Sequence, residues 1–228
     1  LAWIIIPAVG ALPMIFADLN LTYTDAFFEA MSGITTTGST VIVGLDNVQP
    51  GILLWRALLQ WLGGIGIIGM AIAIMPLLQV GGMQLFRMES SDKSEKIMPR
   101  AAQLIAYIGF IYLFLTVLCA LLYWVAGLSG FDAIAHAMTT IATGGFSTHD
   151  LSIGYFENKG LELIAIVFML LGSLPFVLYL KTLRGNVNAL WKDSQVQWFF
   201  VIVITAIGVM AIYLWQTKGK DPLYALFN

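Results

Sequence analysis

The sequence contains few charged residues, one cysteine and two histidines. Asp, Glu, Lys and Arg make up 11% of the chain, against roughly a quarter of an ordinary soluble domain. This low charge, together with 59% hydrophobic residues, excludes an ordinary soluble domain. The single cysteine, Cys119, has no disulfide partner within the chain and is interpreted as a small packing residue. His136 and His149 lack the surrounding Cys, Asp or Glu residues at ligand spacing that a metal site requires.

Long apolar runs are abundant and predict membrane-spanning helices. A helix needs about 20 apolar residues to cross the hydrocarbon core, and the alternating pattern of a barrel strand is absent. We therefore predict an all-α, polytopic membrane protein, with spans at Leu1–Phe16, Pro50–Leu78, Ala102–Ala126, Gly160–Leu180 and Val196–Trp215. No initiator methionine or basic segment precedes the first run, so we expect no cleavable signal peptide and a chain truncated at both ends.

Basic residues are unevenly divided between the two sides of the membrane. Two loops hold most of them and are assigned to the cytoplasm by the positive-inside rule: Arg87, Lys93, Lys96, Arg100, Lys181, Arg184 and Lys192. The opposite side then carries Asp18, Asp25, Asp46, Asp132, Asp150, Glu157 and Asp221. These carboxylates either form an acidic vestibule that attracts cations or simply keep the loops soluble.

One segment occurs twice. Asp25–Gly38 returns 107 residues later as Asp132–Gly145, and seven of the fourteen positions are identical. Each copy opens with an aspartate that we expect to cap a short helix, and each ends in Thr-x-Gly. Each copy also lies between two apolar runs that are long enough to span. A short helix and a glycine loop between spanning helices is the layout of an ion-channel pore.

The repeat predicts how the chain is organised. A third copy of the short helix is expected to begin at Asp221, where Asp221-Pro-Leu-Tyr aligns with the start of the first copy. The expected parts are a first span–short helix–span repeat, a cytoplasmic linker, a second repeat, a second cytoplasmic linker and an incomplete third repeat: 1–80, 81–101, 102–184, 185–195 and 196–228.

The Thr-x-Gly ends suit the binding of a dehydrated cation. Such an ion must exchange its water shell for oxygen ligands, which backbone carbonyls supply without a charged side chain. Gly38 and Gly145 can adopt the backbone conformations that aim successive carbonyls into a pore. Thr36 and Thr143 add hydroxyl or carbonyl oxygens. The negative ends of both short-helix dipoles would face the ion.

Four stretches resemble one family of transport proteins. The stretches 26–40, 55–67, 81–87 and 141–150 are similar to the bacterial Trk-type potassium uptake proteins of the Trk/Ktr/HKT superfamily. The resemblance implies four repeats in one polypeptide around a single pore. It also implies that the selectivity filter, where K⁺ binds, includes Thr36, Thr37, Gly38, Thr143, Gly144 and Gly145. In this family serine at the first filter glycine is associated with sodium permeation, so glycine at both Gly38 and Gly145 favours K⁺.

The same resemblance implies the cellular setting. It places the protein in the bacterial inner membrane as a homodimer that works with a cytosolic nucleotide-binding regulatory subunit. It implies transport of K⁺ without a cofactor, without enzymatic activity and without nucleic acid. The charged segment Glu89–Lys96 is either a docking patch for that subunit or a solvated linker.

Two alternatives remain open from the sequence. A sodium-permeable or non-selective member of the same family would share these motifs. A membrane enzyme could use the outer loops, where Ser147, His149 and Asp150 lie close together in sequence. A third pattern, the G-x-G-x-x-G of Gly64–Gly69, is rejected as a dinucleotide site because it interrupts an apolar span instead of joining a strand to a helix.

Overall fold

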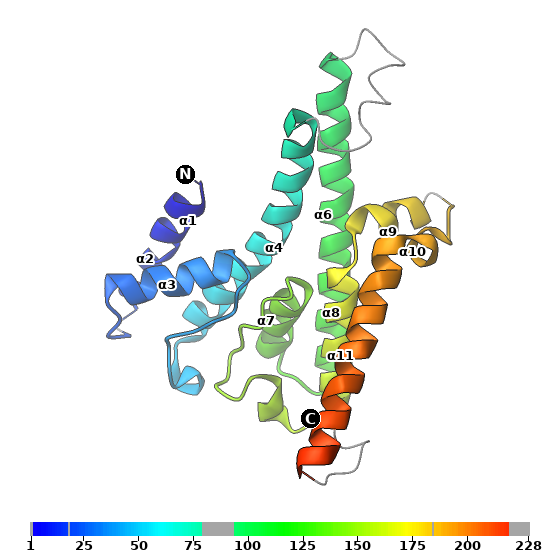
Figure 1. Ribbon diagram of the computed structural model, residues 1–228. Helices are drawn as coiled ribbons and strands as arrows, with labels where there is room; N and C mark the ends of the chain where they lie inside the picture. The colour runs from blue at the N-terminus through cyan, green and yellow to red at the C-terminus, as the bar shows by residue number, and fades with distance from the viewer. Residues whose placement is uncertain (1, 18, 79–93, 184, 219–228) are drawn as a thin grey trace. The chain divides into compact units, whose positions relative to one another are not determined.

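The computed structural model describes residues 2–17, 19–78, 94–183 and 185–218 (Figure 1). Within these ranges the secondary structure is helical, which confirms the all-α prediction. The α-helices are α1 Ala2–Gly10, α2 Leu12–Ile15, α3 Tyr23–Ile34, α4 Pro50–Leu78, α6 Ser94–Val125, α7 Gly130–Ile141, α8 Lys159–Ser173, α9 Phe176–Leu183, α10 Ala189–Lys192 and α11 Ser194–Lys218, and the 3-10 helices are η1 Leu45–Asn47 and η2 Ser152–Phe156. The chain divides into two compact units, Leu1–Ser173 and Leu174–Asn228, which are described separately.

Three of these helices are long and apolar enough to cross a membrane. Their candidate spans are Pro50–Met70, Gln103–Val125 and Ser194–Leu214, and a fourth is counted if α8 and α9 form one broken span. By length and composition these segments coincide with three of the expected spans, as a membrane protein requires.

Two expected spans are interrupted. The predicted span Leu1–Phe16 is divided between α1 and α2, and Pro13 lies in the first turn of α2. The predicted span Gly160–Leu180 is divided because α8 ends at Ser173 and α9 begins at Phe176. The physical reason for the second break is Pro175, which has no N–H to donate and disfavours a helical conformation at Leu174. The prediction of a continuous span at Gly160–Leu180 is therefore wrong, whereas Trp3–Ile15 counts as one short apolar helix.

The short helices α3 and α7 lie inside the first unit. Helix α3 packs against α1 and α4, and α7 packs against α4, α6 and α8 (Figure 1). The packed faces carry small side chains, including Ala26 and Ala30 on α3 and Ala133 and Ala137 on α7, all of them buried. Helix α4 therefore contacts both short helices.

The two short helices end against equivalent glycines. A Cβ added to Gly63 of α4 would lie 2.1 Å from the carbonyl oxygen of Ile34, the last residue of α3. A Cβ added to Gly172 of α8 would lie 2.6 Å from the carbonyl oxygen of Ile141, the last residue of α7. The close approach of helix backbone to a helix C-terminus thus occurs in both copies of the repeated segment.

The second unit contains α9, α10 and α11. Leu174, Leu178 and Val196 form its buried cluster, with Leu190 and Phe199 packed against it. The predicted third short helix, which begins at Asp221, lies outside the described residues.

Candidate functional site

Both short helices begin with a threonine or serine followed three residues later by an aspartate. The hydroxyl of Thr22 accepts the N–H of Asp25 at 3.2 Å, and the Asp25 carboxylate accepts the N–H of Thr22 at 3.1 Å. The hydroxyl of Ser129 likewise accepts the N–H of Asp132 at 3.1 Å. The N-cap residues are therefore Thr22 and Ser129, and the prediction that the aspartates occupy the cap is wrong by three positions. Asp25 completes a capping box from inside the first turn, whereas the Asp132 carboxylate accepts the Ser129 hydroxyl at 2.7 Å.

The segments that follow the two short helices, 36–38 and 143–145, have the same backbone conformation, and we call them the first and second loop. Thr36 and Thr143 have φ values of 54° and 52°, and Gly38 and Gly145 both have φ values of 80°. A left-handed threonine is uncommon and costs free energy, so its occurrence at both equivalent positions is a property of the repeat. The N–H groups of Thr37 and Gly144 turn back to helix carbonyls, each at 2.9 Å.

The two loops meet at their backbones. A Cβ added to Gly38 would lie 1.9 Å from the carbonyl oxygen of Gly144, so position 38 has no room for a side chain. Thr143 and Gly145 are exposed, whereas Gly144 between them is buried. The structure therefore brings the first and second loops together at Gly38 and Gly144.

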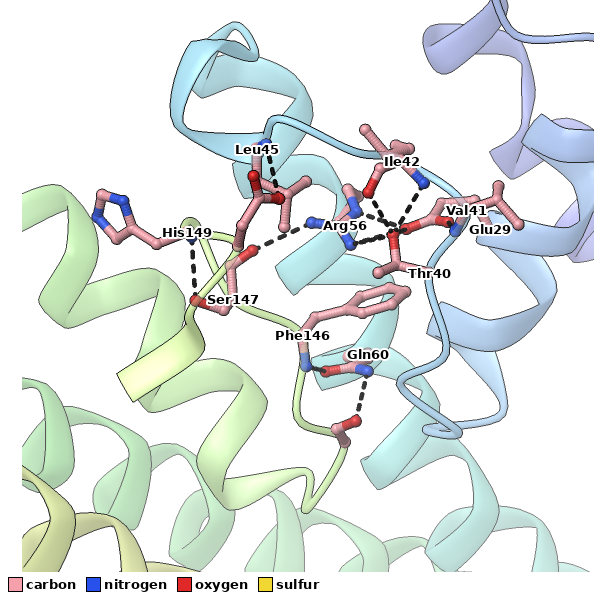
Figure 2. A network of polar contacts seen from close by, with 12 residues as sticks. Glu29, Thr40, Val41, Ile42, Leu45, Arg56, Gln60, Phe146, Ser147 and His149 are labelled. Atoms are coloured by element: carbon pink, nitrogen blue, oxygen red, sulfur yellow. Dashed lines mark hydrogen bonds and ion pairs between the residues drawn. The ribbon is translucent and has the colours of Figure 1, made fainter. Parts of the chain in front are cut away.

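The side chain of Gln60, on α4, forms hydrogen bonds with the backbone of the second loop. Its Nε2 donates to the carbonyl oxygen of Gly144 at 2.9 Å, and its Oε1 accepts the N–H of Phe146 at 3.1 Å (Figure 2). The Gln60 side chain is fully buried. Sequence reasoning missed this residue, although an amide inside an apolar run was a visible signal.

A buried ion pair lies beside the same loops. The guanidinium of Arg56, on α4, approaches the carboxylate of Glu29, on α3, at 2.7 Å, and the two side chains are 1% and 0% exposed. Figure 2 shows Arg56 between Glu29 and Thr40 on one side and Ser147 on the other. Arg56 donates to the Ser147 carbonyl at 3.1 Å, and its Cζ lies 4.1 Å from the centre of the Phe146 ring. This contact adds a cation–π attraction.

The carboxylate of Glu29 has further donors. Its Oε1 accepts the hydroxyl of Thr40 at 2.8 Å, and its Oε2 accepts the N–H of Val41 at 3.0 Å. A buried ion pair needs such additional hydrogen bonds to offset the cost of removing both charges from water. The network joins α3, α4 and the segments after both loops. Sequence reasoning missed both Glu29 and Arg56 as parts of the site.

The second copy of the repeat has different side chains at these positions. His136 stands where the first copy has Glu29, and its ring nitrogens contact the Asp132 carbonyl and the Ser147 hydroxyl, each at 2.9 Å. His136 therefore makes polar contacts beside the short helix. When Gly63 is aligned with Gly172, Ala165 and Met169 stand where α4 has Arg56 and Gln60.

The outer loops connect the two copies as well. The Asp150 carboxylate accepts the N–H groups of Gly44 and Leu45 at 3.0 to 3.1 Å, and His149 Nδ1 contacts the Asp46 carboxylate. The Ser147 hydroxyl instead accepts the backbone N–H of His149 at 3.0 Å. These three neighbouring side chains therefore face different partners and do not form a nucleophilic triad.

The Asp46 contact predicts a pH dependence. The hydrogen bond to His149 lowers the pKa of the Asp46 carboxyl below its ordinary value of 3.8. A lowered pKa stabilises the folded state above the ordinary pKa, and this stabilisation is lost as the pH falls through the folded value. We expect Asp46→Asn to be less stable than wild type at pH 7, and the difference to shrink as the pH falls below 3.8 and through the lowered pKa. Thermal unfolding in detergent, recorded at pH values across this range, measures the difference in stability between Asp46→Asn and wild type. A difference that persists at low pH would contradict the assignment.

The comparisons with known proteins agree with this geometry. The family model described as "TrkH: Cation transport protein" matches residues 1–219. The chain is 46% identical over its full length to the Trk system potassium uptake protein TrkH of Salmonella typhimurium, and 45% identical over 98% of its length to TrkI of Halomonas elongata. It covers 48% and 45% of these proteins, so the chain spans about half the length of the curated relatives it matches.

A solved structure of a related protein also matches the chain. The crystal structure of the potassium transporter TrkH from Vibrio parahaemolyticus superposes with a TM-score of 0.85 at 39% identity, over 99% of this chain and 46% of that one. The resemblance that the repeated motifs indicated is therefore confirmed. The chain belongs to the TrkH family of cation transport proteins.

Proposed function

We propose that the protein takes up potassium across the bacterial inner membrane, through a pore whose filter includes the first and second loops. The observation that carries the proposal is the meeting of two loops with one backbone conformation at Gly38 and Gly144. Matched relatives are named potassium uptake proteins, which supports K⁺ as the transported ion. Their names also support transport as the activity, and no enzymatic reaction is proposed.

The chemistry of the loops supports a cation filter. The alternating left-handed positions at Thr36, Gly38, Thr143 and Gly145 change the direction of successive peptide groups, as carbonyl ligands around an ion require. The C-terminal ends of α3 and α7 precede the loops, so their dipoles favour positive charge there. We assign ion binding to the carbonyl and hydroxyl oxygens of Thr36, Thr37, Gly38, Thr143, Gly144 and Gly145. Of these, the Gly144 carbonyl also accepts the Gln60 amide.

We also propose how the chain is divided into repeats and linkers. We assign 1–80 and 102–184 to two complete repeats, 81–101 and 185–195 to cytoplasmic linkers, and 196–228 to the start of a third. Helix α6 begins at Ser94, within the first linker range. A homodimer and a cytosolic nucleotide-binding regulatory subunit are proposed from the likeness to the family.

The replacement Gly38→Ser tests the function. Serine would place its Cβ against the Gly144 carbonyl at a φ of 80°, where a side chain is strained. The loops must then shift, and discrimination between K⁺ and Na⁺ is expected to fall. The measurement is Rb⁺ and Na⁺ uptake by the protein expressed from its complete gene, in cells without their own K⁺ uptake and with the regulatory subunit supplied.

A matched control is Gly51→Ser, because nothing lies within 4 Å of a Cβ at that position. It should behave as wild type. Equal uptake of Rb⁺ and Na⁺ by the wild type would favour the non-selective alternative. Absence of Rb⁺ uptake, or a Gly38→Ser variant with unchanged selectivity, would show that the filter assignment is wrong.

A further inference from the structure

We infer that α4 of the first repeat positions the second repeat's loop, and that Gln60 is a positioning residue for ion selectivity. The inference rests on the proposed function, because it assigns a role within the same filter. It concerns which part of the chain holds the second loop in its binding geometry.

The Gln60 amide binds the backbone on both sides of Gly145. Its Nε2 donates to the carbonyl of the preceding residue, Gly144, and its Oε1 accepts the N–H of the following residue, Phe146. Gly145 itself is exposed and has a φ of 80°. The side chain therefore fixes the two peptide groups that flank the exposed left-handed residue of the loop.

The packing around this bridge leaves little freedom. A Cβ added to Gly144 would lie 2.3 Å from Cδ of Gln60, so the amide lies directly against the loop backbone. Both Gln60 and Gly144 are buried. A buried carbonyl and a buried N–H that lose their partner stay unsatisfied, since bulk water cannot replace it. The Gln60 amide carries both the N–H donor and the carbonyl acceptor that these two groups require.

Arg56 supplies a second contact from the same helix face. It lies one helical turn before Gln60 and donates to the carbonyl of Ser147 at 3.1 Å. Helix α4 therefore binds the backbone of the second loop and its continuation at three residues: Gly144, Phe146 and Ser147.

The second repeat has no amide side chain at the position equivalent to Gln60. Met169 of α8 occupies the position equivalent to Gln60, is 41% exposed and offers no N–H donor. The second loop is therefore held by the helix of the other repeat. In the cavity-size account of selectivity, a ring of carbonyl ligands discriminates against Na⁺ by resisting contraction around the smaller ion, and a fixed second loop would provide that resistance.

Replacing Gln60 by methionine tests the inference at similar side-chain volume. We expect the Rb⁺/Na⁺ uptake ratio to fall on the order of tenfold, as for the loss of a buried hydrogen bond, while Rb⁺ uptake persists. The full-length protein is measured in cells without their own K⁺ uptake. The ratio is internal to each sample, so it does not depend on how much protein reaches the membrane. Met169→Leu is the control and should keep the wild-type ratio.

A merely structural role for Gln60 gives a different result. In that case Gln60→Met would lower the amount of protein in the membrane and leave the uptake ratio unchanged, which overturns the inference. If Gln60→Met does not reach the membrane, Arg56→Lys decides. Lysine keeps the positive charge opposite Glu29 but cannot reproduce the directed bonds of the guanidinium to Ser147 and Thr40. A reduced ratio supports positioning of the second loop by α4, and an unchanged ratio overturns that part of the inference.

Gly38→Ser separates this inference from the proposed function. Selectivity that falls in Gly38→Ser but stays unchanged in Gln60→Met contradicts only the positioning role. Selectivity that stays unchanged in both variants contradicts the filter itself.

Discussion

Replacing Arg56 by methionine is expected to destabilise the protein by about 3–5 kcal/mol, because it removes one partner of a buried ion pair. Glu29 is fully buried and would lose the guanidinium at 2.7 Å. The Ser147 carbonyl and the Thr40 hydroxyl would lose a donor as well. We expect little folded protein in the membrane and a lower unfolding temperature in detergent.

The double variant Glu29→Gln with Arg56→Met is the informative comparison. It removes both charges, while the glutamine Oε1 still accepts from the Thr40 hydroxyl or the Val41 N–H. We expect it to be more stable than Arg56→Met alone, since the uncompensated buried charge is then absent. Lys192→Met, at an exposed position, controls for the loss of a positive charge. A double variant less stable than the single one would show that the ion pair is not the cause.

A second large effect is expected from Gly63→Ala. The added Cβ would lie 2.1 Å from the carbonyl oxygen of Ile34 and 2.7 Å from its carbonyl carbon, and neither backbone atom can move without displacing the end of α3. Overpacking of this kind costs about 1–3 kcal/mol and occasionally more. Because α3 leads into the first loop, Rb⁺ uptake should fall together with the unfolding temperature.

Gly66→Ala is the matched control in the same helix. Nothing lies within 4 Å of a Cβ at that position. Alanine is a better helix former than glycine by about 1 kcal/mol, so this variant should be as stable as wild type or more stable. Both substitutions replace a helical glycine by alanine, but Gly63→Ala should lower the stability of the protein, whereas Gly66→Ala should leave it unchanged or raise it. If Gly63→Ala were as stable as Gly66→Ala, the close approach of α4 to α3 would be contradicted.

The duplicated segment is the part of the site that the sequence predicted well. Identical residues at equivalent positions predicted two short helices and two glycine loops, and the equal φ values of Gly38 and Gly145 agree with that expectation. The two copies also share a glycine on the helix that follows each loop: Gly63 and Gly172 approach the carbonyl of the last residue of their respective short helices. The helices and loops are set locally, by a few residues close together in the chain, and the glycine contacts recur because both copies keep the same packing.

The contacts between the copies could not be predicted in the same way. Comparison of the two copies finds what they share, whereas Glu29, Arg56 and Gln60 occur in the first copy alone. Their role depends on which helix lies beside which loop, and one sequence does not specify that. The predicted N-caps were wrong because the repeated aspartates, Asp25 and Asp132, lie at the third helical position. The continuous span at 160–180 was wrong because hydrophobicity was weighed above Pro175.

Gln60 on α4 of the first repeat binds the loop of the second repeat, so the two repeats have different roles and their order in the chain matters. A repeat that supports its successor is not interchangeable with it, even though half of their common segment is identical. A chimera that carried two second copies would have methionine where the following loop needs an amide. Exchanging the two copies would therefore remove the amide from the helix that contacts the second loop.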